Sequence, residues 1–482
     1  MVSSSADTAS ICACSRSRIR KVVQYAVLSR AVALLLGAVS NAIVSDYDSS
    51  LSVILSAPAG DVNSTAISAL CNRFARGLAQ VVVRWDAFYF VHIADAGYVY
   101  EQEHAFFPLL PLLMRMLNST VLLPLASAVG RQLSLIVAGV IVSNVSFVLA
   151  AATLYKLGAE TMRNERLAYI AALMYVIAPS NIFMSAVCTE SLFALVVFLA
   201  MLFIGRRNYL LAAGCLGISG LCRSNGLVYA GFFIWNMVIR GDIWQGYAAN
   251  SGNRLVAALV RRMLAALLLV GLSAAGFVAF EVYGRNRLCN GPAALADVLS
   301  KRPYCTSTWS TIYGFVQAEY WNVGFLRYYT LQQLPNFLLA APMIALSLAG
   351  LWTYLAYDPV RLATLGWIHG GRSLGAKPDT ADAVAAAYFG AELLPHMYLW
   401  ALLLGVATTT MHVQVITRFF SSVPAVFWFA AHVVAKAAAR KEGLASAQAS
   451  RSKRWASWIV VGYFVGYGLV GVVLFSNFFP PA

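Results

Sequence analysis

The chain has 482 residues, of which 60% are hydrophobic and only 11% are charged, and its mean hydropathy is +0.70. This composition excludes a water-soluble globule with a polar surface and predicts an all-α polytopic membrane protein. A formal net charge of +15 could suggest a nucleic-acid partner. The basic residues, however, are spread over short loops beside apolar runs, where membrane lipids and topology explain them, so no nucleic-acid role is expected.

Apolar runs long enough to cross a bilayer recur along the whole chain. A spanning helix needs roughly 20 mostly apolar residues. Several runs contain polar or proline breaks, so we expect about 9–11 transmembrane helices in a single membrane domain, 1–482. The candidate spans are 22–44, 106–127, 132–154, 167–187, 189–205, 208–235, 263–283, 335–356, 387–409, 411–433 and 456–478.

The positions of the basic residues predict the orientation. Lys and Arg cluster before the first span, in the loop 236–262 and in the stretch 436–455. Because juxtamembrane Lys and Arg are retained on the cytosolic side, we expect these three segments in the cytosol, with 436–455 as a basic linker. Two larger loops, 45–105 and 284–334, then lie in the lumen. We expect the first of them to carry the catalytic residues.

The end of the first large loop combines acids with aromatic residues. Residues 84–108 read RWDAFYFVHIADAGYVYEQEHAFFP, and they include Asp86 and Glu101. Acids in a loop are often simply solvated. Here the interleaved aromatic side chains, such as Tyr98, favour a cleft at the membrane interface that stacks on sugar rings. A carboxylate in such a cleft could act as a general base on a sugar hydroxyl.

Two arginines fall inside apolar runs. Arg223 lies in GLCRSNGLVYAG, and Arg418 lies in MHVQVITRFFSS, four residues after Gln414 and therefore on the same helical face. A guanidinium at membrane depth must face a cavity, a partner or an anionic ligand. An internal ion pair, for instance with Glu190, and a lipid phosphate bound by the arginine fork are both compatible with the sequence.

Cysteine and metal-binding patterns are weak. Cys289 and Cys305 fall in one expected luminal loop, where spacing alone cannot separate a disulfide from two free thiols. The sequence lacks a metal-ligand spacing, a P-loop, a dinucleotide fingerprint and a DxD motif in the first loop. We therefore expect neither a metal ion nor an organic cofactor.

Eight sequence blocks, in the same order, resemble the second mannosyltransferases of glycosylphosphatidylinositol anchor assembly, polytopic enzymes similar to the C-type glycosyltransferases. No single block would be specific, but YWNVGFLRYY followed at once by LPNFLLAAP is hard to explain otherwise. The blocks are RWD at 84–86, GY at 97–98, YE at 100–101, AFFP at 105–108, RSNGLV at 223–228, YWNVGFLRYY at 320–329, LPNFLLAAP at 334–342 and HVQVITRF at 412–419.

The resemblance implies a reaction and its partners. Mannose would pass from dolichol phosphate mannose to the 6-hydroxyl of a mannosyl-glucosaminyl-acylphosphatidylinositol, with inversion to an α-1,6 bond, in the endoplasmic reticulum membrane. Asp86 would be the catalytic base and Glu101 a reserve base or acceptor ligand. Arg223, Arg418 and Gln414 would bind the donor phosphate. The expected substrate-binding residues are Trp85, Tyr98, Tyr320, Trp321 and Asn322, although the aromatic block 320–329 could instead anchor the next span at the interface.

Two other functions remain open from the sequence. A lipid transporter or scramblase could also bury arginines in broken helices, and Pro179 interrupts one candidate span. Another dolichol-phosphate-dependent glycosyltransferase would share the chemistry and differ in its acceptor. The sequence does not indicate whether an accessory subunit is needed.

Overall fold

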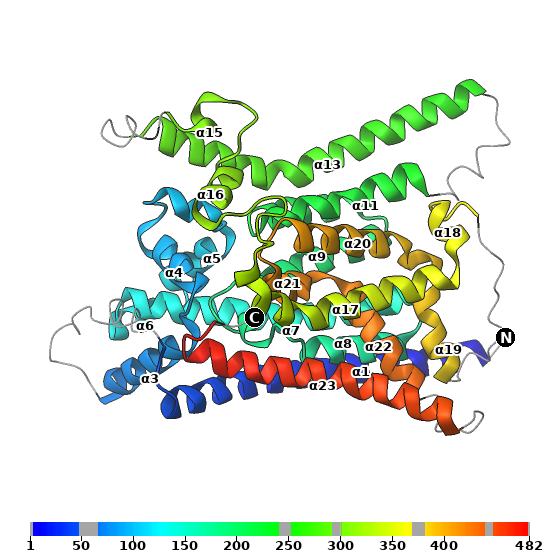
Figure 1. The fold of residues 1–482 in the computed structure, drawn as a ribbon, viewed down its shortest axis with the longest axis horizontal. Helices are drawn as coiled ribbons and strands as arrows, with labels where there is room; N and C mark the ends of the chain where they lie inside the picture. The colour runs from blue at the N-terminus through cyan, green and yellow to red at the C-terminus, as the bar shows by residue number, and fades with distance from the viewer. Residues whose placement is uncertain are drawn as a thin grey trace.

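The computed structural model describes residues 3–47, 66–240, 252–291, 299, 301–368, 381–438 and 447–480. All regular elements in these ranges are helices, which confirms the all-α expectation. The long helices run side by side in a bundle, and the short helices of the two large loops gather at one end of it (Figure 1). The other end carries α18 (Pro359–Ala363) and α19 (Ala381–Ala386).

Six helices in the described part of the chain are long and apolar enough to cross a membrane. Each overlaps one of the expected spans, and several extend beyond it. A run of about 20 apolar residues without a break satisfies its backbone hydrogen bonds internally. The six helices are α1 (Ser3–Ile43), α7 (Arg131–Met162), α13 (Gly252–Cys289), α17 (Leu334–Tyr357), α20 (Leu394–Thr409, within the span Ala391–Thr409) and α23 (Ala447–Ser476).

Two further expected spans are sharply bent. The helices α5 (Leu109–Ser119) and α6 (Leu123–Val129) meet at 86°, and the segment Val413–Ser422 meets α22 (Pro424–Ala438) at the same angle. The second bend has a clear cause, since proline starts α22 and cannot donate a backbone hydrogen bond to the preceding turn. With each bent pair taken as one span, the number of long spans rises to eight.

The remaining three expected spans hold short helices of 12 to 16 residues, and only α9 fills its expected span. They contain α8 (Glu165–Val176), α9 (Glu190–Gly205) and α10 (Tyr209–Gly220), and α10 is followed by a 3-10 helix, η3 (Ser224–Ala230). Irregular backbone at membrane depth is tolerated where it is buried in protein or lines a cavity. Arg223 lies at such a break, between α10 and η3.

The first large loop is mostly helical. It contains α3 (Ala66–Val82), α4 (Asp86–Ala96) and the 3-10 helix η1 (Glu101–Ala105). The helix α3 was not foreseen, and its side chains Ile67, Leu70 and Phe74 are exposed at helical spacing while Ala75 and Ala79 are buried. An exposed apolar stripe of this kind is typical of a helix that lies on a membrane surface.

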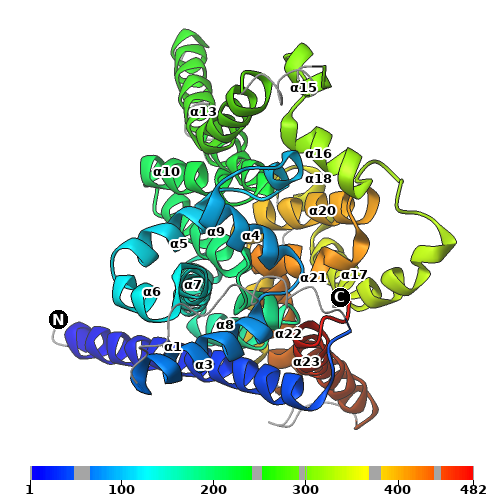
Figure 2. The same cartoon turned by 90° about the vertical axis from the view of Figure 1, so that its left-hand side faces the viewer.

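The second large loop packs against the first. Its main helix is α16 (Ile312–Trp321), preceded by α15 (Pro303–Thr306). Viewed from this end of the bundle, α4 lies over the centre and α16 lies above it (Figure 2). Of the expected basic linker 436–455, Lys436 belongs to α22 and residues from 447 onward to α23; residues 439–446 lie outside the described part.

Candidate active site

Asp86 is the first residue of α4, and the turn before it is held firmly. Arg84 is completely buried, and its Nη2 donates to both carboxylate oxygens of Asp46 and to the backbone carbonyl of Ser476 at the end of α23. Trp85 has a positive φ of 51°, a conformation that non-glycine residues rarely adopt, and its ring lies 5.3 Å from that of Phe478. This turn directs Asp86 into the bundle.

A chain of ion pairs runs inward from Asp86. Nη2 of Arg418 donates to Oδ2 of Asp86 over 2.6 Å, and Nε of the same guanidinium donates to Oε1 of Glu190 over 2.7 Å. Arg223 Nη1 lies 3.1 Å from the same Glu190 oxygen. The Glu190 side chain is completely buried, so it offsets the charge of both arginines inside the bundle.

Both intramembrane arginines also face one cavity. The cavity has a volume of about 510 Å³, and Asp86, Arg223 and Arg418 line it together. Each arginine is therefore paired with Glu190 and also faces a cavity. The ion pair and the open cavity, which the sequence left as alternatives, occur together. Guanidinium groups match the geometry of a phosphate, so two of them beside an open volume can hold one.

The cavity has polar and apolar walls. Phe90, Phe106 and Phe107 supply aromatic surface from the first large loop, and Tyr313, Gln317 and Trp321 face it from α16. The α16 residues recur every fourth position and so share one helical face. Asn225 also lines the cavity, and its Nδ2 is buried without a hydrogen-bond partner among the described residues.

Sequence reasoning missed several lining residues. Asn225 lies in the RSNGLV block and His412 in the HVQVITRF block, so a signal existed for both. The α16 residues Tyr313 and Gln317 lie just before the YWNVGFLRYY block, where only their helical register with Trp321 could have indicated them. Thr410 precedes its block by two positions and carried no signal of its own.

Of the five predicted substrate-binding residues, only Trp321 lines this cavity. Tyr98 is buried, and its hydroxyl donates to the carbonyl of Phe106 over 2.6 Å. Asn322 ends α16 in the left-handed conformation, with φ of 52°. Gln414, predicted to bind the donor phosphate, follows His412 in the bent span but is not among the residues that line the cavity.

Glu101 lies outside the cavity and joins the two large loops. Its carboxylate accepts hydrogen bonds from the hydroxyls of Tyr304 and Tyr320 and from Arg302 Nη2. Burial and the bond to this carboxylate raise the pKa of Tyr320 to about 12, so its hydroxyl keeps its proton. The structure thus gives Glu101 a loop-joining position and not a place beside Asp86.

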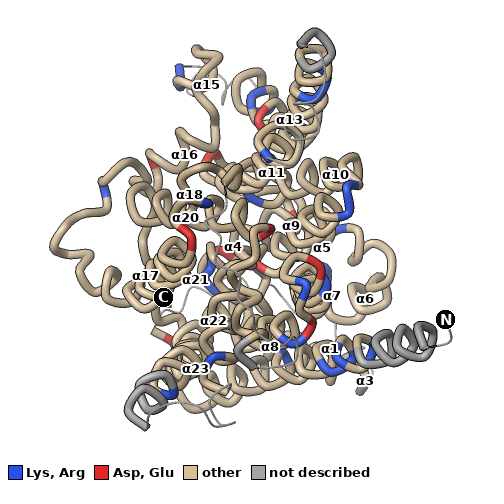
Figure 3. The backbone as a smooth tube through the Cα atoms, turned by 90° about the vertical axis from the view of Figure 1, so that its right-hand side faces the viewer, with Lys and Arg blue, Asp and Glu red and all other residues tan. Residues whose placement is uncertain are grey.

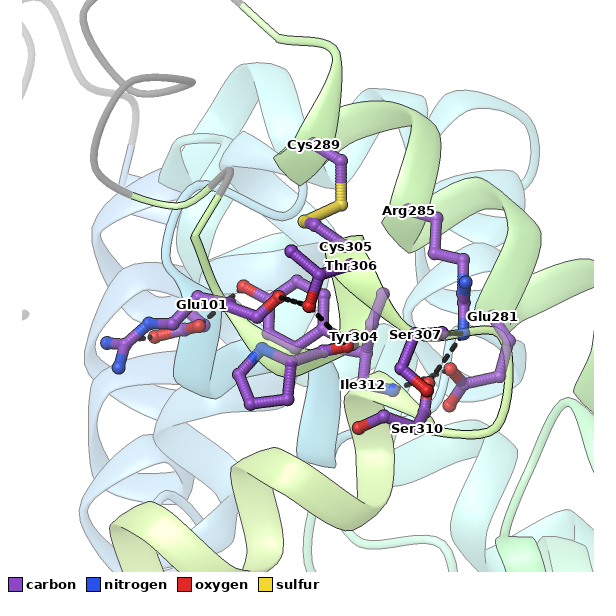
Figure 4. The surroundings of a disulfide bond; sticks show 12 residues. Glu101, Glu281, Arg285, Cys289, Tyr304, Cys305, Thr306, Ser307, Ser310 and Ile312 are labelled. Carbon is purple, nitrogen blue, oxygen red and sulfur yellow. Dashed lines mark hydrogen bonds and ion pairs between the residues drawn. A yellow bond between two sulfur atoms is a disulfide. The ribbon is translucent and has the colours of Figure 1, made fainter.

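A disulfide and a second carboxylate complete this junction (Figure 4). Cys289 at the end of α13 is bonded to Cys305, which decides between the two possibilities that the spacing left open. Glu281 of α13 accepts from the backbone N–H groups of Ile312 at 2.8 Å and Tyr313 at 3.0 Å. A carboxylate at the first turn of α16 is favourable because the backbone N–H groups there lack helical partners.

Comparisons with known proteins agree with the sequence blocks. Residues 19–482 match the family described as "Mannosyltransferase (PIG-V)". The chain is 31% identical to GPI alpha-1,6-mannosyltransferase 2 of Cricetulus griseus and 30% identical to that of Homo sapiens, in each case over 96% of this chain and 98% of the relative. It is 31% identical to GPI mannosyltransferase 2 of Drosophila melanogaster, over 95% of this chain and 99% of the relative.

A solved structure is more distantly similar. The crystal structure of ArnT from Cupriavidus metallidurans bound to undecaprenyl phosphate aligns with 94% of this chain and 76% of its own, at 14% identity and a TM-score of 0.36. The family match covers almost the whole chain, including both large loops and all residues that line the cavity beside Asp86. This membrane protein therefore belongs to the PIG-V family of mannosyltransferases and is a glycosyltransferase.

Proposed function

We propose that the protein transfers the second mannose of the glycosylphosphatidylinositol anchor, in α-1,6 linkage, from dolichol phosphate mannose in the endoplasmic reticulum membrane. Relatives with that acceptor step in their names match nearly the full chain. The observation that carries the proposal is that Asp86, Arg223 and Arg418 line one cavity. A base and two phosphate-binding groups are the parts that this transfer requires.

In the proposed reaction Asp86 accepts the proton of the acceptor 6-hydroxyl. The hydroxyl oxygen attacks the anomeric carbon of the donor mannose, and the bond between that carbon and the phosphate oxygen breaks. The electron pair leaves with dolichol phosphate, and the β-linked donor gives an α-linked product. A phosphate leaving group needs no proton from an acid, but its growing negative charge is stabilised by Arg418 and Arg223.

The pairing of Arg418 suggests an order of events. Its Nη2 is bonded to Asp86 and its Nε to Glu190, which is buried and fixed. A donor phosphate at the cavity end of this guanidinium competes with Asp86 and not with the buried Glu190. Donor binding would then loosen Asp86 and let it turn toward the acceptor hydroxyl.

The acceptor sugar would lie against the cavity face of α16. Trp321 offers an aromatic plane there, and the Gln317 amide offers both a donor and an acceptor. Asp86 and Arg418 line the same cavity from two other elements, α4 and the bent span. The reacting hydroxyl would thus be held between the base and the donor.

Complementation of cells that lack the second anchor mannosyltransferase tests the proposal. Asp86→Asn is compared with Asp95→Asn, a matched change on the same helix, where the Asp95 side chain pairs with Arg131 at the surface and is absent from the cavity lining. Wild type and Asp95→Asn should restore surface anchored proteins, whereas Asp86→Asn, expressed equally, should accumulate the precursor with one mannose. Rescue by Asp86→Asn would remove it as the base, and failure of wild type would overturn the acceptor assignment.

A further inference from the structure

A second cavity lies at the opposite end of the bundle from Asp86. It has a volume of about 490 Å³ and is lined by the last turn of α7, the end of α9, the segment after η3 and the start of α20. The helix α7 connects the Asp86 end of the bundle to the second cavity. Arg131 at its start pairs with Asp95 of α4, and Arg163, which lines the second cavity, directly follows its last residue. Its 32 residues span roughly 48 Å at about 1.5 Å each.

The lining of this second cavity is rich in arginine. Figure 3 looks at this end and shows Lys and Arg on helices that reach it, among them α7 and α13, which both contribute to the lining. The two acids in the lining are already paired, Glu160 with Arg206 at 2.5 Å and Glu392 with Arg240 at 2.9 Å. An anion in the cavity would thus meet carboxylates whose charge is offset. The four lining arginines are Arg163, Arg207, Arg240 and Arg262, and Arg240 among them is the partner of Glu392.

Two of these arginines occupy unfavourable backbone conformations. Arg163 has φ of 51° and Arg207 has φ of 59°, in the left-handed region where glycine is preferred. Both follow helix C-termini, where a positive charge contributes about 0.3–1 kcal/mol, whereas the conformation costs on the order of 1 kcal/mol or more. The interaction with the helix dipole at most offsets the cost of the left-handed backbone conformation. It does not by itself account for arginine at both positions.

A buried histidine contributes to the cavity wall. His396 of α20 lines the cavity with only 5% of its surface exposed, and its Nδ1 has no hydrogen-bond partner among the described residues. Its ring packs against Phe232 and Trp428, which fixes its orientation.

The other wall of the cavity is apolar. Phe232, Trp235 and Met201 contribute to it, and they come from two of the shorter apolar helical segments, Glu190–Gly205 and Ser224–Ile239. Guanidinium groups at a helix end next to such a wall suit a ligand with a phosphate head and hydrocarbon tails. We propose that this second cavity binds the phosphate headgroup of an anionic membrane lipid.

Binding of short-chain lipids to the purified full-length protein tests this proposal. The ligands are dioctanoyl phosphatidic acid, dioctanoyl phosphatidylcholine and inorganic phosphate, and the readout is the saturable rise in melting temperature that binding to the folded state produces. The variant Arg163→Gln/Arg207→Gln is compared with Arg20→Gln/Arg166→Gln, which removes the same charge from exposed arginines outside the cavity lining.

Phosphatidic acid should stabilise wild type and the control variant with the same apparent affinity. Its affinity should fall at least tenfold in Arg163→Gln/Arg207→Gln. Equal effects of phosphatidylcholine and phosphatidic acid would overturn the proposal, as would equal affinity losses in the test and control variants. An equal response to inorganic phosphate would overturn the assignment to a lipid.

A second measurement needs no variant. Native mass spectrometry of the wild-type protein, purified in mild detergent, should show one retained anionic phospholipid, and added phosphatidic acid should replace it. Retention of zwitterionic lipid alone would contradict the proposal even if the double variant failed to fold.

Discussion

Asp86 and Arg418 are 332 positions apart in the chain, yet Nη2 of the arginine donates to Oδ2 of the aspartate over 2.6 Å at the mouth of a buried ion-pair chain. The same guanidinium reaches the fully buried Glu190 through Nε. A residue that holds the proposed base on one side and a buried carboxylate on the other couples the chemistry of the cavity to the stability of the bundle.

Replacement of Arg418 should therefore affect both properties. Arg418→Ala should lower mannosyl transfer by about 10²–10³-fold, because the leaving phosphate loses a charged donor, and should also lower the melting temperature, since Glu190 loses a partner. Arg418→Lys keeps the charge but not the two-sided fork, so it should recover stability more than activity. Transfer measured in membranes and melting of the purified protein check this; full activity of Arg418→Ala would contradict the proposed role.

Glu190→Gln should act mainly on stability. Removal of one partner from a buried ion pair costs about 3–5 kcal/mol because the remaining charge stays buried, and here two guanidinium groups remain. Glu160→Gln, which breaks the surface pair with Arg206, is the control and should cost about 0–1 kcal/mol. Comparable melting temperatures for the two variants would show that Glu190 is not the centre of the network.

Glu101→Gln should weaken acceptor binding more than turnover. The carboxylate holds Tyr304, Tyr320 and Arg302, and through them it positions α16, whose Trp321 faces the cavity. Hydrogen bonds to a charged group contribute about 1.5–3 kcal/mol, so the apparent KM for the acceptor should rise about tenfold or more.

Kinetics with a synthetic acceptor separate the two roles of Glu101. Glu319→Gln, an exposed carboxylate 4.0 Å from Arg302, is the control and should behave as wild type. A collapse of kcat with an unchanged KM would indicate instead that Glu101 takes part in the chemistry.

Loss of the Cys289–Cys305 disulfide should loosen the second large loop. The bond closes a loop with a sequence separation of 16, and closure of a loop of this length stabilises a protein by about 3 kcal/mol in the chain-entropy account. Cys289→Ser/Cys305→Ser should lower the melting temperature and make transfer insensitive to dithiothreitol. Wild type should lose activity on reduction, and Cys71→Ser, which removes a free thiol, should leave that sensitivity unchanged.

Acid should destabilise the first large loop through His104. Burial lowers the pKa of this imidazole from 6.5 to about 4, so between these values the unfolded chain binds a proton that the folded protein does not. The stability contributed by neutral His104 is therefore present above about pH 6.5 and falls as the pH drops toward 4, by up to roughly 3 kcal/mol. The melting temperature of wild type should fall more steeply than that of His104→Gln as the pH drops across this window. Parallel plots of melting temperature against pH would contradict this prediction.

Much of the site could be predicted from local sequence. The RWD turn marked Asp86, and the apolar runs around Arg223 and Arg418 marked both arginines, because a charge at membrane depth is costly without a function or a partner. The long uninterrupted spans also agree with the structure, since their backbone hydrogen bonds are local. The prediction was weakest where spans contain breaks, as in α8 to η3, because helix ends there depend on tertiary packing.

The sequence by itself determined the class of protein, the family and the residue types that carry charge into the membrane, because hydropathy and short sequence blocks are local properties. Only the tertiary structure decided that Glu190 joins the two arginines, that Glu101 holds the loops together and that Cys289 pairs with Cys305. These are contacts between segments far apart in the chain. Their geometry depends on how the broken helices pack, which no local pattern encodes.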